Sequence, residues 1–298
     1  MPQLTTNQFY LHVANLALLN AVFAMSLGLI SSVGQLSLGH AAFAALGAYL
    51  SALGALQLKI PPIFGILLAG IAAGGLAAVL GRIILRLRGV YFVLVTFLVG
   101  QMCALVALNW ESVTRGANGL VGIPPISILG YTLSSRAQFY YFALSVFLAV
   151  LVFIWALMRS QYGRAFRSIA ENIQLAESSG IDTSRYQVIA FALGSGIAGS
   201  AGAATAHYIR YISPDTFTFH DSVAYITMLV VGGRQTLVGG VLGAAFLTPL
   251  PEVLRGFAGV QHIIYGAILL AVLMFLPGGL ASIGALVTRR RVRLETSK

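Results

Sequence analysis

Charged residues are scarce in this sequence. Only 9% of its 298 residues are Asp, Glu, Lys or Arg, whereas 58% are hydrophobic. Soluble domains carry about a quarter charged residues, so this composition excludes an ordinary soluble protein and indicates one that spans a membrane. The polar runs between the apolar segments are short, which leaves no room for a separate soluble domain. We therefore expect residues 1–298 to form a single transmembrane domain.

Motifs for catalysis or for cofactor binding are also missing. The sequence has no GxxxxGK[ST] phosphate loop, so we do not expect the chain to hydrolyse ATP. It has no GxSxG or HExxH motif, and the string at 194–199 that fits GxGxxG lies inside an apolar segment with no strand before it. The single cysteine, Cys103, excludes an internal disulfide, and His40 has no second metal ligand at helical spacing. We expect no enzyme activity, cofactor or metal in this chain.

The apolar segments have the length of membrane-spanning helices, which need about 20 residues. They lie at 11–30, 41–57, 62–81, 90–110, 139–158, 187–209 and 263–281. A further apolar region, 222–249, is broken at Gly232-Gly233-Arg234-Gln235 and is expected to form two shorter segments that meet at a turn. The sequence predicts an all-α, polytopic membrane bundle of about eight to nine transmembrane or half-spanning helices.

Basic residues predict the orientation of the bundle. They gather in three connections, at Arg82 to Arg88, in the loop 159–186, and at Arg289 to Arg293, while the first ten residues contain no Lys or Arg. Because basic connections stay in the cytoplasm, we expect the N-terminus outside, the C-terminus inside, and the loop 111–136 outside a bacterial inner membrane. This distribution also accounts for the net charge of +10 without a nucleic-acid partner.

Small residues recur at the spacing that brings helices into contact. Gly70 and Gly74, Gly239 and Gly243, and the run at 194–203 are the examples. Glycines four residues apart let two backbones approach closely, which drives helix association in lipid. We expect a tightly packed bundle.

Polar residues interrupt the apolar pattern at 31–40. Gln35, Ser37 and His40 lie there among glycines, and Gln101 is a costly residue within the span 90–110. Irregular backbone at membrane depth occurs where it is buried in protein or lines a watery cavity, so these residues are candidates for a translocation path. A capped cytoplasmic turn explains 31–40 equally well, and contact between helices is the favoured explanation of Gln101.

Five ionisable residues cluster near one external loop. They are His207, Arg210, Asp215, His220 and Asp221. They could receive a partner or a polar solute, but a solvated loop would have the same composition, and we favour that interpretation.

The loop 159–186 is the longest polar stretch and has helical periodicity. Phe166, Ile169, Ala170 and Ile173 form an apolar stripe, and Arg164, Arg167 and Glu171 fall on the opposite face. Glu177 falls on the apolar side, so a bend near Asn172 or a partner for Glu177 is required. Anionic lipid could bind such a helix, but its acidic residues would be repelled, which favours a protein partner.

Five stretches together resemble one family, the branched-chain amino acid permeases of ABC importers, and most closely its second permease subunit. They are GQLSLGHAAFAALGAY at 34–49, RLRGVYFVLVTFLVGQ at 86–101, NWESVTRGANGLVGIP at 109–124, GRAFRSIAENIQLAESSGI at 163–181, and MLVVGGRQTLVGGVLGAAFL at 228–247. The chain departs from the family pattern at Arg115 and Gln235, where glycine is usual, and at Gly240, where proline is usual.

The resemblance implies partners and site residues. It implies a sister permease subunit, two cytoplasmic ATP-binding subunits that consume ATP, and an external periplasmic solute-binding protein, all around a chain embedded in membrane lipid. The residues that match the ATPase-coupling segment are Gly163, Arg164, Arg167, Glu171, Glu177 and Gly180, and those that match the early motif are Gln35, Ser37 and His40.

Three functions remain open. The resemblance favours import of branched-chain or related amino acids, and related permeases carry other small solutes such as urea. A secondary transporter or channel working alone would need intramembrane carboxylates, which the central spans lack. A membrane scaffold without transport would not need the polar interruptions at 31–40 and 232–236.

Overall fold

The structure is a computed structural model that describes residues 8–128, 131–234, 236, 238–254, 261–276 and 278–282. Five of its helices are long and apolar enough to cross a membrane, and most of their residues are Leu, Ile, Val, Ala and Phe. They are α1 (Gln8–Ser31), α3 (Pro62–Ile84), α4 (Val90–Asn109), α6 (Arg136–Arg159) and α9 (Thr183–Ile209). The predicted all-α membrane bundle is therefore confirmed.

Shorter helices complete the bundle. They are α2 (His40–Gln57), α10 (Phe219–Gly232), α11 (Gly239–Leu247), α12 (Leu250–Val253) and α13 (Gln261–Phe275). The predicted break in 222–249 is confirmed, because α10 and α11 are separate helices. At about 1.5 Å per residue they reach roughly 21 and 14 Å, which is less than a hydrocarbon core of about 30 Å. The predicted span 263–281 is too long, because α13 ends at Phe275.

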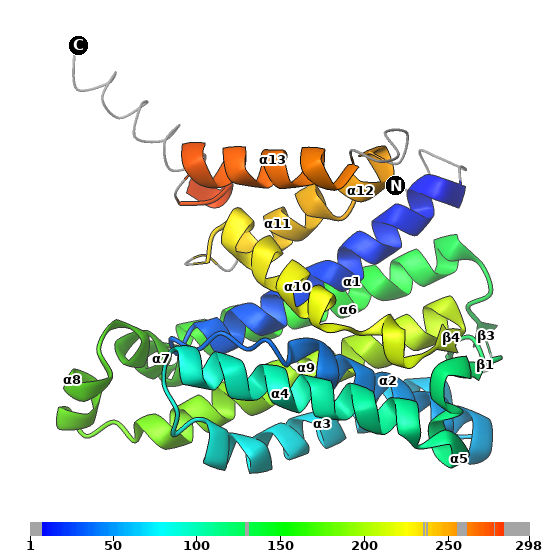
Figure 1. The fold of residues 1–298 in the computed structure, drawn as a ribbon, viewed down its shortest axis with the longest axis horizontal. Coiled ribbons are helices and arrows are strands. Elements are labelled where there is room, and N and C mark those ends of the chain that lie inside the picture. Colours follow the sequence, from blue (N-terminus) through cyan, green and yellow to red (C-terminus); the bar gives the residue numbers. More distant parts are fainter. Residues whose placement is uncertain are drawn as a thin grey trace.

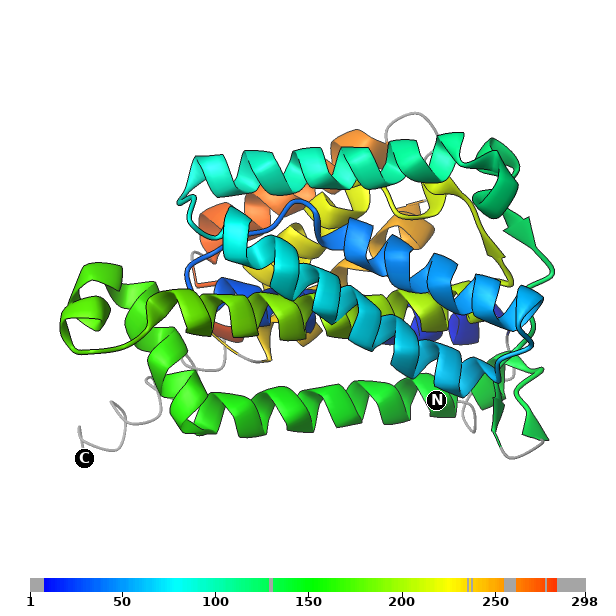
Figure 2. The ribbon, with the colours of Figure 1, turned by 90° about the horizontal axis from the view of Figure 1, so that it is seen from below.

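The two ends of the bundle differ in structure (Figures 1 and 2). One end, the loop end, carries α7 (Gln161–Glu171), α8 (Ile173–Ser178) and the turn between α3 and α4. The opposite end, the strand end, carries α5 (Glu111–Thr114), η1 (Gly116–Asn118), η2 (Pro214–Thr216) and four two-residue strands. There β1 (Leu120–Val121) pairs with β4 (Tyr211–Ile212), and β2 (Ser127–Ile128) pairs with β3 (Tyr131–Thr132), both antiparallel. The predicted loops 159–186 and 111–136 thus lie at opposite ends.

Glycines set the closest helix contacts, as the sequence predicted. In α9, Gly196 packs against Gly74 of α3, and Gly199 packs against Gly47 of α2. A Cβ atom added at Gly47 or at Gly202 would overlap the backbone of the facing helix. The glycines of the GxGxxG-like string therefore serve helix packing.

The segment between α1 and α2 turns back into the bundle. After Ser31 the chain returns beside α4, where the amide of Leu38 donates to Oγ1 of Thr96 over 3.2 Å. Helix α2 then begins at His40 in the interior (Figure 2). Its Ala41 amide donates to Oγ of Ser222 in the first turn of α10, so the first turns of the two helices meet inside the bundle. The segment therefore starts at the loop end, where Gly34 lies against Ala170 of the loop 159–186, and ends inside the bundle.

Candidate functional site

A cavity of about 500 Å³, the outer cavity, lies where α2 and α10 begin. Helix α4 forms one wall, and the segment that leads from η2 into α10 forms another. Its polar lining residues are Gln101, Asp215, Thr218, His220 and Ser222. Gln101, predicted as a path residue or as a contact between helices, therefore faces open space.

The ionisable cluster predicted near the external loop has several roles. His207 is buried, with Nδ1 2.7 Å from the Pro124 carbonyl and Nε2 2.9 Å from Oγ of Ser51. It joins the external loop to α9 and α2, so the solvated-loop interpretation is wrong for this residue. Asp221 caps α10 by accepting hydrogen bonds from the amide and hydroxyl of Thr218.

The other members of that cluster divide between the cavity and the surface. Asp215 and His220 line the outer cavity, whereas Arg210 is an exposed residue with a positive φ of 62° at the end of α9.

A second cavity of about 660 Å³, the inner cavity, opens at the loop end. Its walls come from the last turns of α1 and α6, from α7, and from the break between α10 and α11. Its charged lining residues are Arg167, Glu171 and Arg234, all of them exposed. Nε of Arg234 donates to Oγ of Ser31 over 2.6 Å, which ties the α10–α11 break to the end of α1.

Phe23, Ser26, His40 and Tyr225 form a buried cluster, the central cluster, near both cavities. Tyr225 stacks on Phe23 with ring centroids 4.7 Å apart and meets the His40 ring edge-on at 6.3 Å. Along α10, Ser222 lines the outer cavity and Leu229 lines the inner one, and Tyr225 lies between them. The central cluster therefore lies between the two cavities along α10.

Hydrogen bonds hold the His40 ring in this cluster. Its Nε2 is 2.8 Å from Oγ of Ser26, and the Ser26 hydroxyl is 2.8 Å from the Phe23 carbonyl. A serine hydroxyl has one hydrogen, so if Ser26 donates to the carbonyl, His40 must donate through Nε2. Nδ1 of His40 then has no hydrogen-bond partner within the described part of the chain.

The predicted path residues occupy different places. Gln101 lines the outer cavity, and His40 belongs to the central cluster. Gln35 and Ser37 are buried in the segment 32–39 and are not among the residues that line either cavity.

The loop 159–186 folds into two helices joined at Asn172. Helix α7 begins after Ser160, whose hydroxyl accepts the Tyr162 amide, and it buries Phe166 and Ile169 in the bundle. Asn172 has extended backbone and caps α8, because its Oδ1 accepts the Leu175 amide over 3.1 Å. The predicted bend at Asn172 is confirmed. Ala170, assigned to the apolar stripe, is exposed, because its place on α7 lines the inner cavity.

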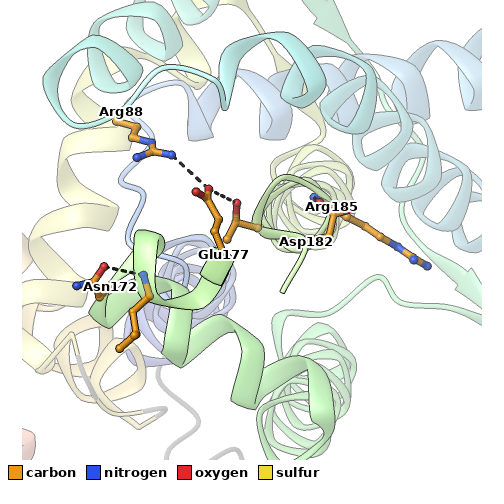
Figure 3. A network of polar contacts seen from close by, with 7 residues as sticks. Arg88, Asn172, Glu177, Asp182 and Arg185 are labelled. Carbon is orange, nitrogen blue, oxygen red and sulfur yellow. Dashed lines mark hydrogen bonds and ion pairs between the residues drawn. The ribbon is translucent and has the colours of Figure 1, made fainter. Parts of the chain in front are cut away.

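The second alternative, a partner for Glu177, is found as well (Figure 3). Its Oε1 accepts a hydrogen bond from Oγ1 of Thr183 over 2.8 Å, and Nη2 of Arg88 lies 3.5 Å away in the α3–α4 turn. Asp182 caps α9 through the Arg185 amide, as one of the predicted caps. Glu177 therefore joins α8 to α9 and to the turn before α4.

The other predicted coupling residues shape this loop or lie on its surface. Gly163 packs against the backbone of Met158 with no room for a Cβ atom, and Gly180 has a positive φ of 82°. Arg164 is exposed, and the Leu175 side chain on α8 is 65% exposed. The loop thus has an anchored side and a free side.

Comparison with known proteins identifies the family. A family described as the branched-chain amino acid transport system permease component matches residues 9–277. The chain belongs to this family. LivM, the high-affinity branched-chain amino acid transport system permease protein of Salmonella typhimurium, is 27% identical over 96% of this chain and 72% of its own length. LivM of Escherichia coli is 27% identical over 95% of this chain and 71% of its own length.

A second kind of relative matches a smaller region. The autoinducer 2 import system permease protein LsrC of Salmonella typhi is 34% identical over 42% of this chain and 38% of its own length. No solved structure matches the chain. These relatives are transport subunits rather than enzymes, and with the five long apolar helices they make this permease a multi-pass membrane protein.

Sequence reasoning missed three residues that the structure brings into the site. Arg88 was assigned only to a basic connection, and Tyr225 was one aromatic residue in an apolar run. Arg234 was noted only as part of the break in 222–249. Its position in that polar break was the one available signal, because a charge inside an apolar region requires a partner. Gln235 and the basic residues 289–293 lie outside the described residues.

Proposed function

We propose that this permease is the translocation subunit of an ATP-driven importer for branched-chain or related amino acids. The observation that carries the proposal is the α7–α8 unit, which is anchored to the bundle on one side and exposed on the other. The chain has no phosphate loop, so energy must come from another subunit. The solute is proposed from the relatives named for branched-chain amino acid transport.

The distribution of charge supports the proposed orientation. By the elements that contain or flank them, the basic residues at the loop end in the described part of the chain are Arg82, Arg86, Arg88, Arg159, Arg164, Arg167, Arg185 and Arg234. Those at the strand end are Lys59, Arg115, Arg136 and Arg210. Lys and Arg accumulate in cytoplasmic loops, so the loop end faces the cytoplasm and the strand end faces the periplasm.

The proposed partners follow from this orientation. Two ATP-binding subunits drive the transporter, and one of them docks on the loop 159–186 of this single permease domain. Gly163 and Gly180 shape the docking unit, Arg164 meets the partner, and Arg167, Glu171 and Glu177 face back toward the bundle. The solute-binding protein docks at the strand end, around the loop 111–136, and a sister permease completes the membrane part.

The proposed mechanism moves the central cluster. Closure of the ATP-binding subunits displaces α7 and α8 as a unit. Rigid-body movement of packed elements is a common form of conformational switching. Contacts of Phe166, Ile169 and Glu177 transmit the displacement to the bundle. Separation of Tyr225 from Phe23 and His40 then joins the outer cavity, which contains Gln101, to the inner one.

Reconstitution of the complete transporter in proteoliposomes tests this function. We expect uptake of labelled L-leucine that requires the binding protein, Mg-ATP and this chain. Uptake of urea but not of leucine would show that the proposed solute is wrong and would leave the proposed role as a translocation subunit unchanged. Uptake without the ATP-binding subunits would instead establish a secondary transporter, and normal uptake without this chain would establish a scaffold.

A further inference from the structure

The inner cavity combines three charges at its mouth. Arg167, Glu171 and Arg234 are exposed, and none of them forms an ion pair with another described residue. Two cations and one anion around one opening match a ligand that carries both a carboxylate and an ammonium group. The volume of about 660 Å³ lies in the range of small-molecule sites.

Arg234 is held in position for such a ligand. Its Nε donates to Oγ of Ser31, which is buried with 5% exposure at the end of α1. This bond leaves both terminal nitrogens of the guanidinium without a partner in the described part of the chain. A guanidinium held in this way can bind a carboxylate with two parallel hydrogen bonds.

The most deeply buried part of the cavity lining, its floor, is apolar. Met25, Leu29, Ile154 and Leu229 line it, and each of them is at most 3% exposed. An aliphatic side chain can rest on these residues. A phospholipid acyl chain would need an open apolar groove that continues to the bilayer, and these four buried residues do not form one. The shape therefore favours a short aliphatic ligand over a lipid.

We propose that the inner cavity is a cytoplasmic binding site for a free aliphatic amino acid. The carboxylate binds Arg234 and Arg167, the ammonium group binds Glu171, and the side chain packs on the apolar floor. Because α7 forms a wall of the cavity, an occupied site opposes displacement of α7, so accumulated amino acid slows its own import. The inference rests on the proposed function for the orientation of the loop end.

Equilibrium binding to the complete transporter in nanodiscs, without the solute-binding protein, tests this site. The probe is labelled L-leucine, and we expect saturable binding. Leucinamide lacks the carboxylate and 4-methylpentanoate lacks the ammonium group, so each should compete about tenfold less well than leucine. Arg234→Gln should weaken leucine binding about tenfold. Arg234→Lys keeps the charge but loses the paired N–H donors of the guanidinium, so its affinity should lie between those of Arg234→Gln and the unchanged protein. Arg86→Gln, an exposed arginine at the same end but outside the cavity, should bind as the unchanged protein does.

Several results would overturn the site. They are an absence of saturable leucine binding, equal competition by leucinamide, and unchanged affinity in Arg234→Gln. Native mass spectrometry that finds phosphatidylethanolamine lost in Arg234→Gln and not displaced by leucine would assign the cavity to a lipid headgroup and overturn it too. ATP-driven leucine uptake by the same preparation separates the two proposals, since uptake without inner-site binding refutes the site alone.

Discussion

Replacing Glu177 with lysine tests whether α8 must stay attached to the bundle for coupling. In the native protein, Oε1 of Glu177 accepts from Thr183 and lies 3.5 Å from Nη2 of Arg88. Lysine removes the acceptor and places a second cation beside Arg88. Glutamine at the same position keeps an oxygen acceptor for both neighbours and loses only the charge, so Glu177→Gln is the matched control.

The structure sets the size of the effect. The hydrogen bond from Thr183 is worth about 1 kcal/mol. The ion pair joins side chains that are 58% and 46% exposed, so it contributes only about 0–1 kcal/mol. Repulsion between two cations adds a few tenths more in water, which gives a total near 2 kcal/mol, or a factor of roughly 30 in the attachment of α8. Helix α8 has six residues and buries only Ala176 among them, so this loss is large for it.

The assay is leucine transported per ATP hydrolysed by the complete transporter in proteoliposomes. We expect Glu177→Lys to lower this ratio about fivefold or more while the complex still assembles, and Glu177→Gln to stay within about twofold. Combining Glu177→Lys with Arg88→Glu should restore part of the loss, because the ion pair forms again with reversed charges. If Glu177→Gln fails as severely as Glu177→Lys, the carboxylate acts on the ATP-binding subunit and not through Thr183 and Arg88. Normal coupling in Glu177→Lys would show that the attachment of α8 is not needed for coupling.

Three further variants test the packing, the central cluster and the external loop. In Gly202→Val the new side chain overlaps the backbone of α2, so this variant should be less stable by about 1–3 kcal/mol in thermal unfolding. The control is Gly75→Ala, where a Cβ atom meets nothing within 4 Å, and it should unfold as the unchanged protein does. Equal unfolding of these two variants would contradict the packing of α2 on α9. Tyr225→Ala should raise ATP-independent leucine efflux from proteoliposomes, and an unchanged leak would show that the central cluster does not separate the cavities. His207→Leu leaves the buried Ser51 hydroxyl and the partly buried Pro124 carbonyl without their partner, at a cost of about 1–3 kcal/mol. Proteolysis of the external loop should therefore be faster, and an unchanged rate would refute the anchoring role.

Much of the fold was predictable because it depends on local composition. The long spans follow from runs of apolar residues, and the break in 222–249 follows from adjacent glycines and a charge. The position of Glu177 on the apolar face predicted either a bend near Asn172 or a partner for Glu177, and the structure has both. Asn172 forms the bend by ending α7 and capping α8.

The errors have physical reasons as well. Ala170 matched the apolar stripe by spacing, but a small residue at that position faces the inner cavity, which only the neighbouring helices create. His207 resembled a solvated loop residue because its partners, Ser51 and the Pro124 carbonyl, lie 156 and 83 residues away in the chain. The candidate site depends on contacts of the same kind, between residues that are far apart along the chain.

The sequence alone determined that the chain lies in a membrane and that the region 222–249 is broken into two helices, and it predicts that the loop 159–186 meets a partner. These properties follow from hydropathy, from glycine and proline, and from helical periodicity, all of which act over a few residues. Only the tertiary structure decided that Tyr225, Phe23 and His40 pack together between two cavities, and that Ser31 holds Arg234 at the inner one. Those contacts join residues up to 203 positions apart, and no local preference determines which helix faces which.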